Sequence, residues 1–160
     1  MTPADVLALS LLVTDAAGVH PARPIVEAGA AAILAECEAR PLYLYVHASG
    51  VETCVSLFVT HSFRESGWRL DAVGDNGTSF GPFQDKLLGH KPRTWEEATA
   101  HFGRLLKRAS VCETPLEMLA SGHCGAGAGR DISTARVREA ERVLLAWRLG
   151  APDDPHGLRP

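Results

Sequence analysis

The sequence predicts a single, mainly helical domain, and three observations lead to this prediction. The chain has 160 residues, which is long enough for one hydrophobic core, and its apolar fraction of 46% and charged fraction of 22% are ordinary for a globular protein. Apolar side chains recur every three to four residues in several segments, as they do on one face of a helix. Residues that favour helix N-caps stand before several of those segments. We assign residues 1–150 to the domain and the polar, Pro-rich residues 151–160 to a flexible C-terminal tail.

Two helices are predicted in the N-terminal part of the chain. The first begins with Thr2 as N-cap, has Asp5 in its first turn and ends at Gly18. The second spans 25–39, where several alanines would let a neighbouring helix approach closely. The short segment 41–46 alternates only loosely, and we expect an extended linker there rather than an edge strand.

Further helices are predicted in the C-terminal half. Thr94 and Glu97 form a capping box at the start of one helix. A second capping box begins a short helix at 114–122, and a final helix spans 133–149. Between these two lies the glycine-rich segment 122–129. We expect a flexible connection there rather than a phosphate-binding loop, because it follows a helix and carries no Gly-Lys-Ser/Thr.

The central predicted helix, 51–65, presents a glutamate at its C-terminal end. Four residues at helical spacing share one face of it: Cys54, Phe58, Ser62 and Glu65. Glu65 therefore points inward in the last turn, where the helix dipole and partial burial both favour its protonated form. A general acid needs that form near neutral pH. The alternative is a solvated glutamate at a helix end. His61, one turn earlier, could contact Glu65 or lie on the helix surface.

A polar, glycine-rich stretch follows the central helix and extends the pattern. Its residues in order are Glu65, Ser66, Ala72, Val73, Gly77, Ser79, Gly81 and Gln84. This spacing resembles the signature of the transglycosylase SLT family, the lytic transglycosylases and goose-type lysozyme relatives. The resemblance implies a lysozyme-like domain in which Glu65 is the catalytic acid and Ser66 supports it. It also implies that Gly81 and Gln84 belong to a turn that lines the substrate groove.

The chain departs from the family pattern at three places. The loop between Val73 and Gly81 is about one residue longer than the commonest version, and Pro82 and Phe83 replace the usual Leu-Met. The family often has an Ala-Tyr-Asn-x-Gly-like segment after the catalytic region, where this chain has Leu-Ala-Ser-Gly at 119–122. In the absence of that Tyr and Asn, Ser121 or His123 is expected to supply the polar contact. This departure leaves full catalytic efficiency open.

The resemblance implies a mechanism with one carboxylate. Lytic transglycosylases of this type protonate the glycosidic oxygen with a glutamate, which then takes the proton from the C6 hydroxyl of N-acetylmuramic acid. That hydroxyl attacks C1 and leaves a 1,6-anhydro product. Phe80 and Phe83 could pack against sugar faces, although we expect at least one of them to belong to the core. Ser79 and Gln84 are expected to bind N-acetyl groups.

Three other functions stay open. Glycosidases usually use two carboxylates, so Asp75 is a possible second acid that positions water in a hydrolytic lysozyme. The missing Tyr and Asn favour a glycan-binding or virion structural module without turnover. A helical regulator that binds no glycan would not explain the whole 65–84 pattern.

Charge and hydropathy restrict the partners of the protein. The net charge of −3 provides no basic surface for nucleic acid, so the expected partners are peptidoglycan glycan strands bound locally. No apolar run is long enough to span a bilayer. The apolar segment 6–13 lies between Asp5 and Asp15 and predicts a packed helix rather than a classical signal peptide. We expect a monomer without cofactor that acts on the cell wall, either in the periplasm or outside the cell, or delivered by a phage-type route.

Four cysteines allow three pairings. A bridge between Cys112 and Cys124 would clamp the glycine-rich segment, and one between Cys37 and Cys54 would join consecutive helices. Disulfides would suit an oxidising compartment, although buried free thiols are also common. His123 adjoins Cys124, but no Cys-x-x-Cys or paired ligand spacing accompanies it, so we expect no metal site.

Overall fold

The computed structural model of the chain describes residues 1–16, 18, 20–40, 50–108 and 128–150. Its helices are α1 (Pro3–Ala16), α2 (Arg23–Ala39), α3 (Val51–Ser66), α4 (Trp95–Arg108) and α6 (Ala128–Arg148). The described strands are β1 (Val73–Gly74) and β2 (Ser79–Phe80), which form one small antiparallel hairpin. The predicted mainly helical class is therefore confirmed. The lysozyme-like arrangement stays a prediction.

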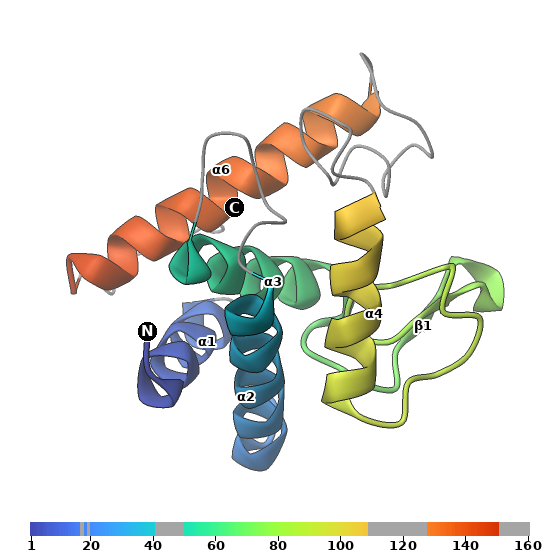
Figure 1. Ribbon diagram of the computed structural model, residues 1–160, viewed down its shortest axis with the longest axis horizontal. Coiled ribbons are helices and arrows are strands. Elements are labelled where there is room, and N and C mark those ends of the chain that lie inside the picture. The colour runs from blue at the N-terminus through green and yellow to red at the C-terminus, as the bar shows by residue number, and fades with distance from the viewer. Residues whose placement is uncertain (17, 19, 41–49, 109–127, 151–160) are drawn as a thin grey trace.

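Helix α3 is the centre of this arrangement. It packs against α1 and α2 on one side and against α6 on the other, while α4 packs against α2 with the hairpin beyond it (Figure 1). Each of these helices contributes fully or nearly fully buried side chains to one core, among them Val6, Leu9, Ile33, Phe58, Phe102, Leu106, Ala140 and Val143. The segment that begins at Glu65 thus follows directly from α3, the helix that packs against three others.

Local sequence signals set the beginnings of two helices. At α1 the Asp5 carboxylate accepts hydrogen bonds from the Thr2 backbone N–H (2.6 Å) and hydroxyl (2.8 Å), which lower the pKa of Asp5. At α4 the Thr94 hydroxyl accepts the Glu97 N–H at 3.2 Å, as predicted. The Glu97 carboxylate reaches one residue further back than a capping box requires and accepts the Arg93 N–H at 2.6 Å.

Two predicted helix starts differ from the structure. Helix α2 begins at Arg23, two residues before the predicted start. Helix α6 begins at Ala128, five residues before the predicted start, so Ala128 and Gly129 are helical rather than part of a loop. A glycine is tolerated in the first turn because the N–H groups there have no intrahelical partner in any case. The predicted linker 41–46, the short helix 114–122 and the tail 151–160 lie outside the described residues.

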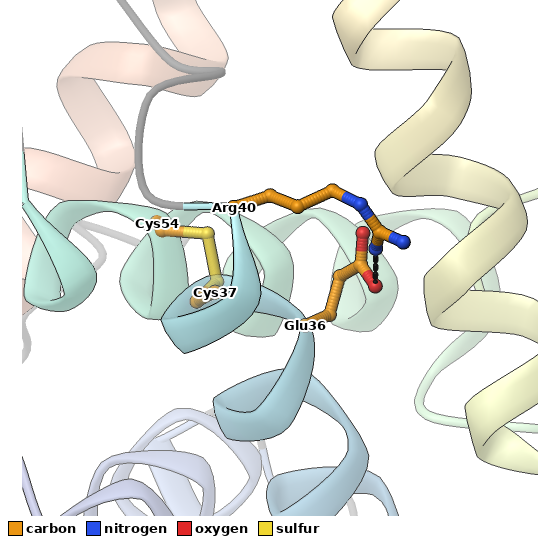
Figure 2. The surroundings of a disulfide bond; sticks show 4 residues. All are labelled: Glu36, Cys37, Arg40 and Cys54. Atoms are coloured by element: carbon orange, nitrogen blue, oxygen red, sulfur yellow. Dashed lines mark hydrogen bonds and ion pairs between the residues drawn. A yellow bond between two sulfur atoms is a disulfide. The ribbon is translucent and has the colours of Figure 1, made fainter.

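A disulfide joins the end of α2 to the first turn of α3 (Figure 2). It links Cys37 and Cys54, whose Cα atoms are 5.7 Å apart, and is one of the pairings that the sequence left open. Cys112 and Cys124 lie outside the described residues. Beside the disulfide, Glu36 and Arg40 form an ion pair on the side of α2 that faces α4 (Figure 2). None of the described helices is long and apolar enough to cross a membrane.

Candidate functional site

Helix α3 ends one residue after Glu65, at Ser66. Gly67 adopts the left-handed conformation (φ 63°) and its N–H donates to the Phe63 carbonyl at 2.8 Å, which ends α3. Trp68 follows with φ 65° and is fully buried against Trp95 of α4, at a ring distance of 5.0 Å. Gly29 of α2 gives both indoles room, because a Cβ there would lie 2.9 Å from Trp68 and 3.0 Å from Trp95. Helices α2 and α4 therefore anchor the turn that follows Glu65.

Glu65 lies in the last turn of α3, and 29% of its side chain is exposed. The three residues that share its predicted face, Cys54, Phe58 and Ser62, are fully buried, which confirms the orientation of the helix. Glu65 Oε1 accepts a hydrogen bond from Arg136 Nη2 of α6 at 3.0 Å and lies 4.0 Å from His61 Nδ1. The carboxylate is thus half-enclosed and paired with a positive charge.

Arg136 belongs to a chain of charges between α3 and α6. Its Nη1 lies 3.8 Å from Glu139 Oε2, and Arg64 Nε donates to Glu139 Oε1 at 2.8 Å. Glu139 is only 4% exposed, so this charged side chain is buried between α3 and α6. The sequence offered one signal for this burial, because Glu139 is next to Ala140, which is also buried. No local pattern pointed to Arg136, because its partner Glu65 is 71 residues away.

Ser66 organises the turn rather than the carboxylate. Its hydroxyl donates to the Ser62 carbonyl at 3.0 Å and accepts the Arg69 N–H, also at 3.0 Å. The side chain is buried within α3 and the first residues after it. Ser66 therefore supports Glu65 by holding the backbone that follows.

The hairpin carries Asp75 at its turn and Ser79 in its second strand. Val73 pairs with Phe80 and Gly74 with Ser79. The Ser79 hydroxyl, fully buried, donates to Asp75 Oδ2 at 2.6 Å, and Lys86 Nζ lies 3.0 Å from the same oxygen. The Ser79 hydrogen bond, followed by Lys86, lowers the pKa of Asp75. These two predicted site residues hold the hairpin together, so a contact of Ser79 with a sugar would require opening of its bond to Asp75.

The turn after the hairpin is held by backbone constraints. Gly81 has φ 73°, donates its N–H to the Ala72 carbonyl at 2.9 Å and leaves no room for a Cβ, because Pro92 would lie 2.6 Å away. Gln84 also has positive φ (49°), and its side-chain amide donates to the Gly81 carbonyl at 3.0 Å. Gly74 lies against the other side of that amide. Gln84 is half-buried and is the predicted residue of this turn that keeps a partly exposed polar group.

Phe83 belongs to the core in this structure. It is 4% exposed, stacks on Phe102 at a ring distance of 4.4 Å and meets Phe58 edge to face at 5.5 Å. Of the two roles considered for Phe83, the structure therefore supports packing in the core rather than contact with a sugar. His61 joins the same cluster and stacks on Phe102 at 4.9 Å. Burial, and then Arg136, lower the pKa of His61 to about 3, whereas Glu139 acts in the opposite direction.

The structure therefore brings Glu65 and Ser66 together at the end of α3. Ser79, Gly81, Phe83 and Gln84 form the hairpin and turn that follow, with Asp75 at the hairpin tip. Ser121 and His123 lie outside the described residues. Within the described ranges, no group of three or more His, Cys, Asp and Glu side chains is arranged to hold a metal ion.

Comparisons with known proteins add no assignment to this geometry. No family model matches the chain, and neither a curated protein nor a solved structure matches it.

Proposed function

We propose that the protein is a peptidoglycan lytic transglycosylase that cleaves the β-1,4 bond between N-acetylmuramic acid and N-acetylglucosamine. The observation that carries the proposal is the setting of Glu65. A partly exposed carboxylate ends the central helix, and the hairpin and the Gly81–Gln84 turn follow it at the spacing of the transglycosylase pattern. Enclosure on one side and access on the other suit an acid that must meet a substrate oxygen.

The mechanism requires one carboxylate in two protonation states. Protonated Glu65 donates its proton to the glycosidic oxygen as the bond to C1 breaks. The resulting carboxylate then accepts the proton of the C6 hydroxyl while that oxygen bonds to C1, and the acid is regenerated with the anhydro product. Asp75 is not needed as a second catalytic acid, and its bonds to Ser79 and Lys86 support a structural role at the hairpin.

Two observations favour other outcomes. Asp75 presents a partly exposed carboxylate on the hairpin, which is the second carboxylate that a hydrolytic lysozyme would require. The Arg136–Glu65 ion pair favours a glycan-binding module without turnover, because the guanidinium occupies an oxygen of the proposed acid. Transglycosylation therefore requires that this ion pair opens when substrate binds.

The test is mass spectrometry of purified peptidoglycan digested with the wild type, with Glu65→Gln and with Glu52→Gln as control. Glu52 lies at the other end of α3 and pairs with Arg148, so its substitution changes a carboxylate on the same helix outside the proposed site. Anhydromuropeptides from the wild type and the control, but not from Glu65→Gln, would support the proposal. Reducing-end products would indicate a lysozyme. Sedimentation with peptidoglycan but no release by any variant would leave a binding module.

A further inference from the structure

One oxygen of Glu65 has two different neighbours. Oε1 lies 3.0 Å from the guanidinium of Arg136 on α6 and 4.0 Å from the imidazole Nδ1 of His61 on α3. The arginine contact is a single hydrogen bond rather than a bidentate pair, because only Nη2 reaches the carboxylate. Helix α6 lies along α3 here (Figure 1), so the two neighbours approach from different helices. His61 is therefore the nearby polar group on the helix that carries Glu65.

The Nδ1 atom of His61 lacks a partner. It is buried and makes no hydrogen bond to any of the described residues, and the whole side chain is only 10% exposed. A buried polar atom left unpaired is costly and uncommon in folded proteins, so such an atom beside a candidate acid calls for an explanation. One turn of helix separates the two residues, which places both side chains on the same face. The carboxyl of Glu65 is the group that could satisfy it.

The charge state of His61 suits an orienting role. The ring stacks on Phe102 at 4.9 Å, and burial and Arg136 keep the imidazole neutral by lowering its pKa to about 3, against the opposing effect of Glu139. A neutral N–H can donate to a carboxyl oxygen in both the acid and the carboxylate form. It does not compete for the acid proton, because the ring does not become charged.

We propose that His61 is a positioning residue for Glu65, whose Nδ1–H donates to Oε1 and so directs the acid proton on Oε2 toward the glycosidic oxygen. This inference rests on the proposed function, since it concerns the acid of that reaction. The distance of 4.0 Å must shorten by about 1 Å for this bond, and catalytic hydrogen bonds commonly tighten in this way when substrate binds. When the ion pair between Arg136 and Glu65 opens, Oε1 of Glu65 is free to accept the hydrogen bond from His61. No proton is transferred to the ring, and the proton that Oε2 gives to the leaving oxygen returns to Oε2 from the C6 hydroxyl.

The test compares three substitutions that differ in where they place an N–H. His61→Asn keeps an amide N–H close to the Nδ1 position, His61→Gln moves it to the Nε2 position, and His61→Phe keeps only the aromatic packing. Steady-state release of anhydromuropeptides from soluble, uncrosslinked glycan strands separates kcat from KM. His90→Phe is the control, because His90 also pairs with a carboxylate, that of Glu97, but on the outside of α4. Thermal unfolding followed by circular dichroism reports the folded fraction of each variant.

We expect His61→Phe and His61→Gln to lower kcat about tenfold or more with little change in KM, since a misdirected acid loses rate rather than binding. His61→Asn should stay within about threefold of the wild type, because one hydrogen bond of this kind is retained. The control should keep its activity. Equal losses for His61→Asn and His61→Gln would overturn the proposal, because they would show that the position of the N–H does not matter. Retained activity in His61→Phe would also overturn it, because it would show that only the shape of the ring matters. If His61→Phe does not fold, the difference in kcat between His61→Asn and His61→Gln tests the proposal.

A measurement on the wild type needs no folded variant of His61. Nitrogen-15 NMR distinguishes the two neutral tautomers of a histidine ring, and we expect the proton on Nδ1, with a shift that changes in Glu65→Gln. A proton on Nε2 instead would overturn the inference while leaving the proposed activity intact. Absence of anhydromuropeptides with the wild type would overturn both proposals.

Discussion

Gly29→Ala introduces a methyl group where α2 meets the turn that follows Glu65. An ideal Cβ at position 29 would lie 2.9 Å and 3.1 Å from ring atoms of Trp68 and 3.0 Å from a ring atom of Trp95. These contacts are shorter than real Cβ atoms tolerate without movement of the neighbour. Trp68 is fully buried and Trp95 is 3% exposed, so neither rigid indole can turn away into solvent. The strain must be taken up by the packing of α2 against the turn.

The expected change in stability combines two opposing effects. Overpacking of a core costs about 1–3 kcal/mol. Replacing a helical glycine by alanine contributes about 0.5–1 kcal/mol in the other direction. Because three ring contacts are too short, we expect overpacking to win and the free energy of unfolding to fall by about 1–2 kcal/mol.

Urea denaturation followed by circular dichroism measures this difference, with the disulfide kept oxidised. Ala31→Gly, an exposed site on the same helix, calibrates the helix-propensity effect and should cost about 1 kcal/mol. The double variant Gly29→Ala/Trp68→Phe should lose less free energy of unfolding than the two single variants lose in sum, since the smaller ring gives the new methyl group room. A Gly29→Ala protein more stable than the wild type would refute the close packing described for this turn.

Three further predictions follow from other contacts. Replacing Cys37 and Cys54 together by serine should lower the free energy of unfolding by about 3 kcal/mol, the effect of opening a loop of this length, and an unchanged urea midpoint would contradict a bridge between them. Phe83→Ala should cost about 3–5 kcal/mol, because it leaves a cavity in the aromatic cluster, whereas a change confined to substrate KM would restore its role in sugar binding. The pKa of Asp75 is held below its ordinary value, so its stabilising contribution is present above that value and is lost as the pH falls through the lowered one. Ser79→Ala should therefore raise the pKa of Asp75 in a carboxyl NMR titration, and an unchanged midpoint would show that the hydroxyl does not bond to it in solution.

Much of the helical framework followed from local sequence patterns. Thr2 and Thr94 identified the beginnings of α1 and α4, because a cap depends on residues within about four positions. The spacing of Phe58 and Glu65 identified the buried face of α3 for the same reason. The start of α6 was placed too late, since the glycines before it suggested a loop.

The sequence by itself thus determined the helical class, the position of Glu65 at the end of a buried helix and the turn beyond it, whereas the β1–β2 hairpin was not predicted. Only the tertiary structure decided which groups meet that carboxylate. Arg136 is 71 residues from Glu65, so no periodicity or cap could pair them. Phe83 and Ser79 have the residue types of a sugar site, yet packing on Phe102 and the bond to Asp75 use them internally. Helix signals depend on neighbours along the chain, whereas burial and pairing depend on how separate elements pack.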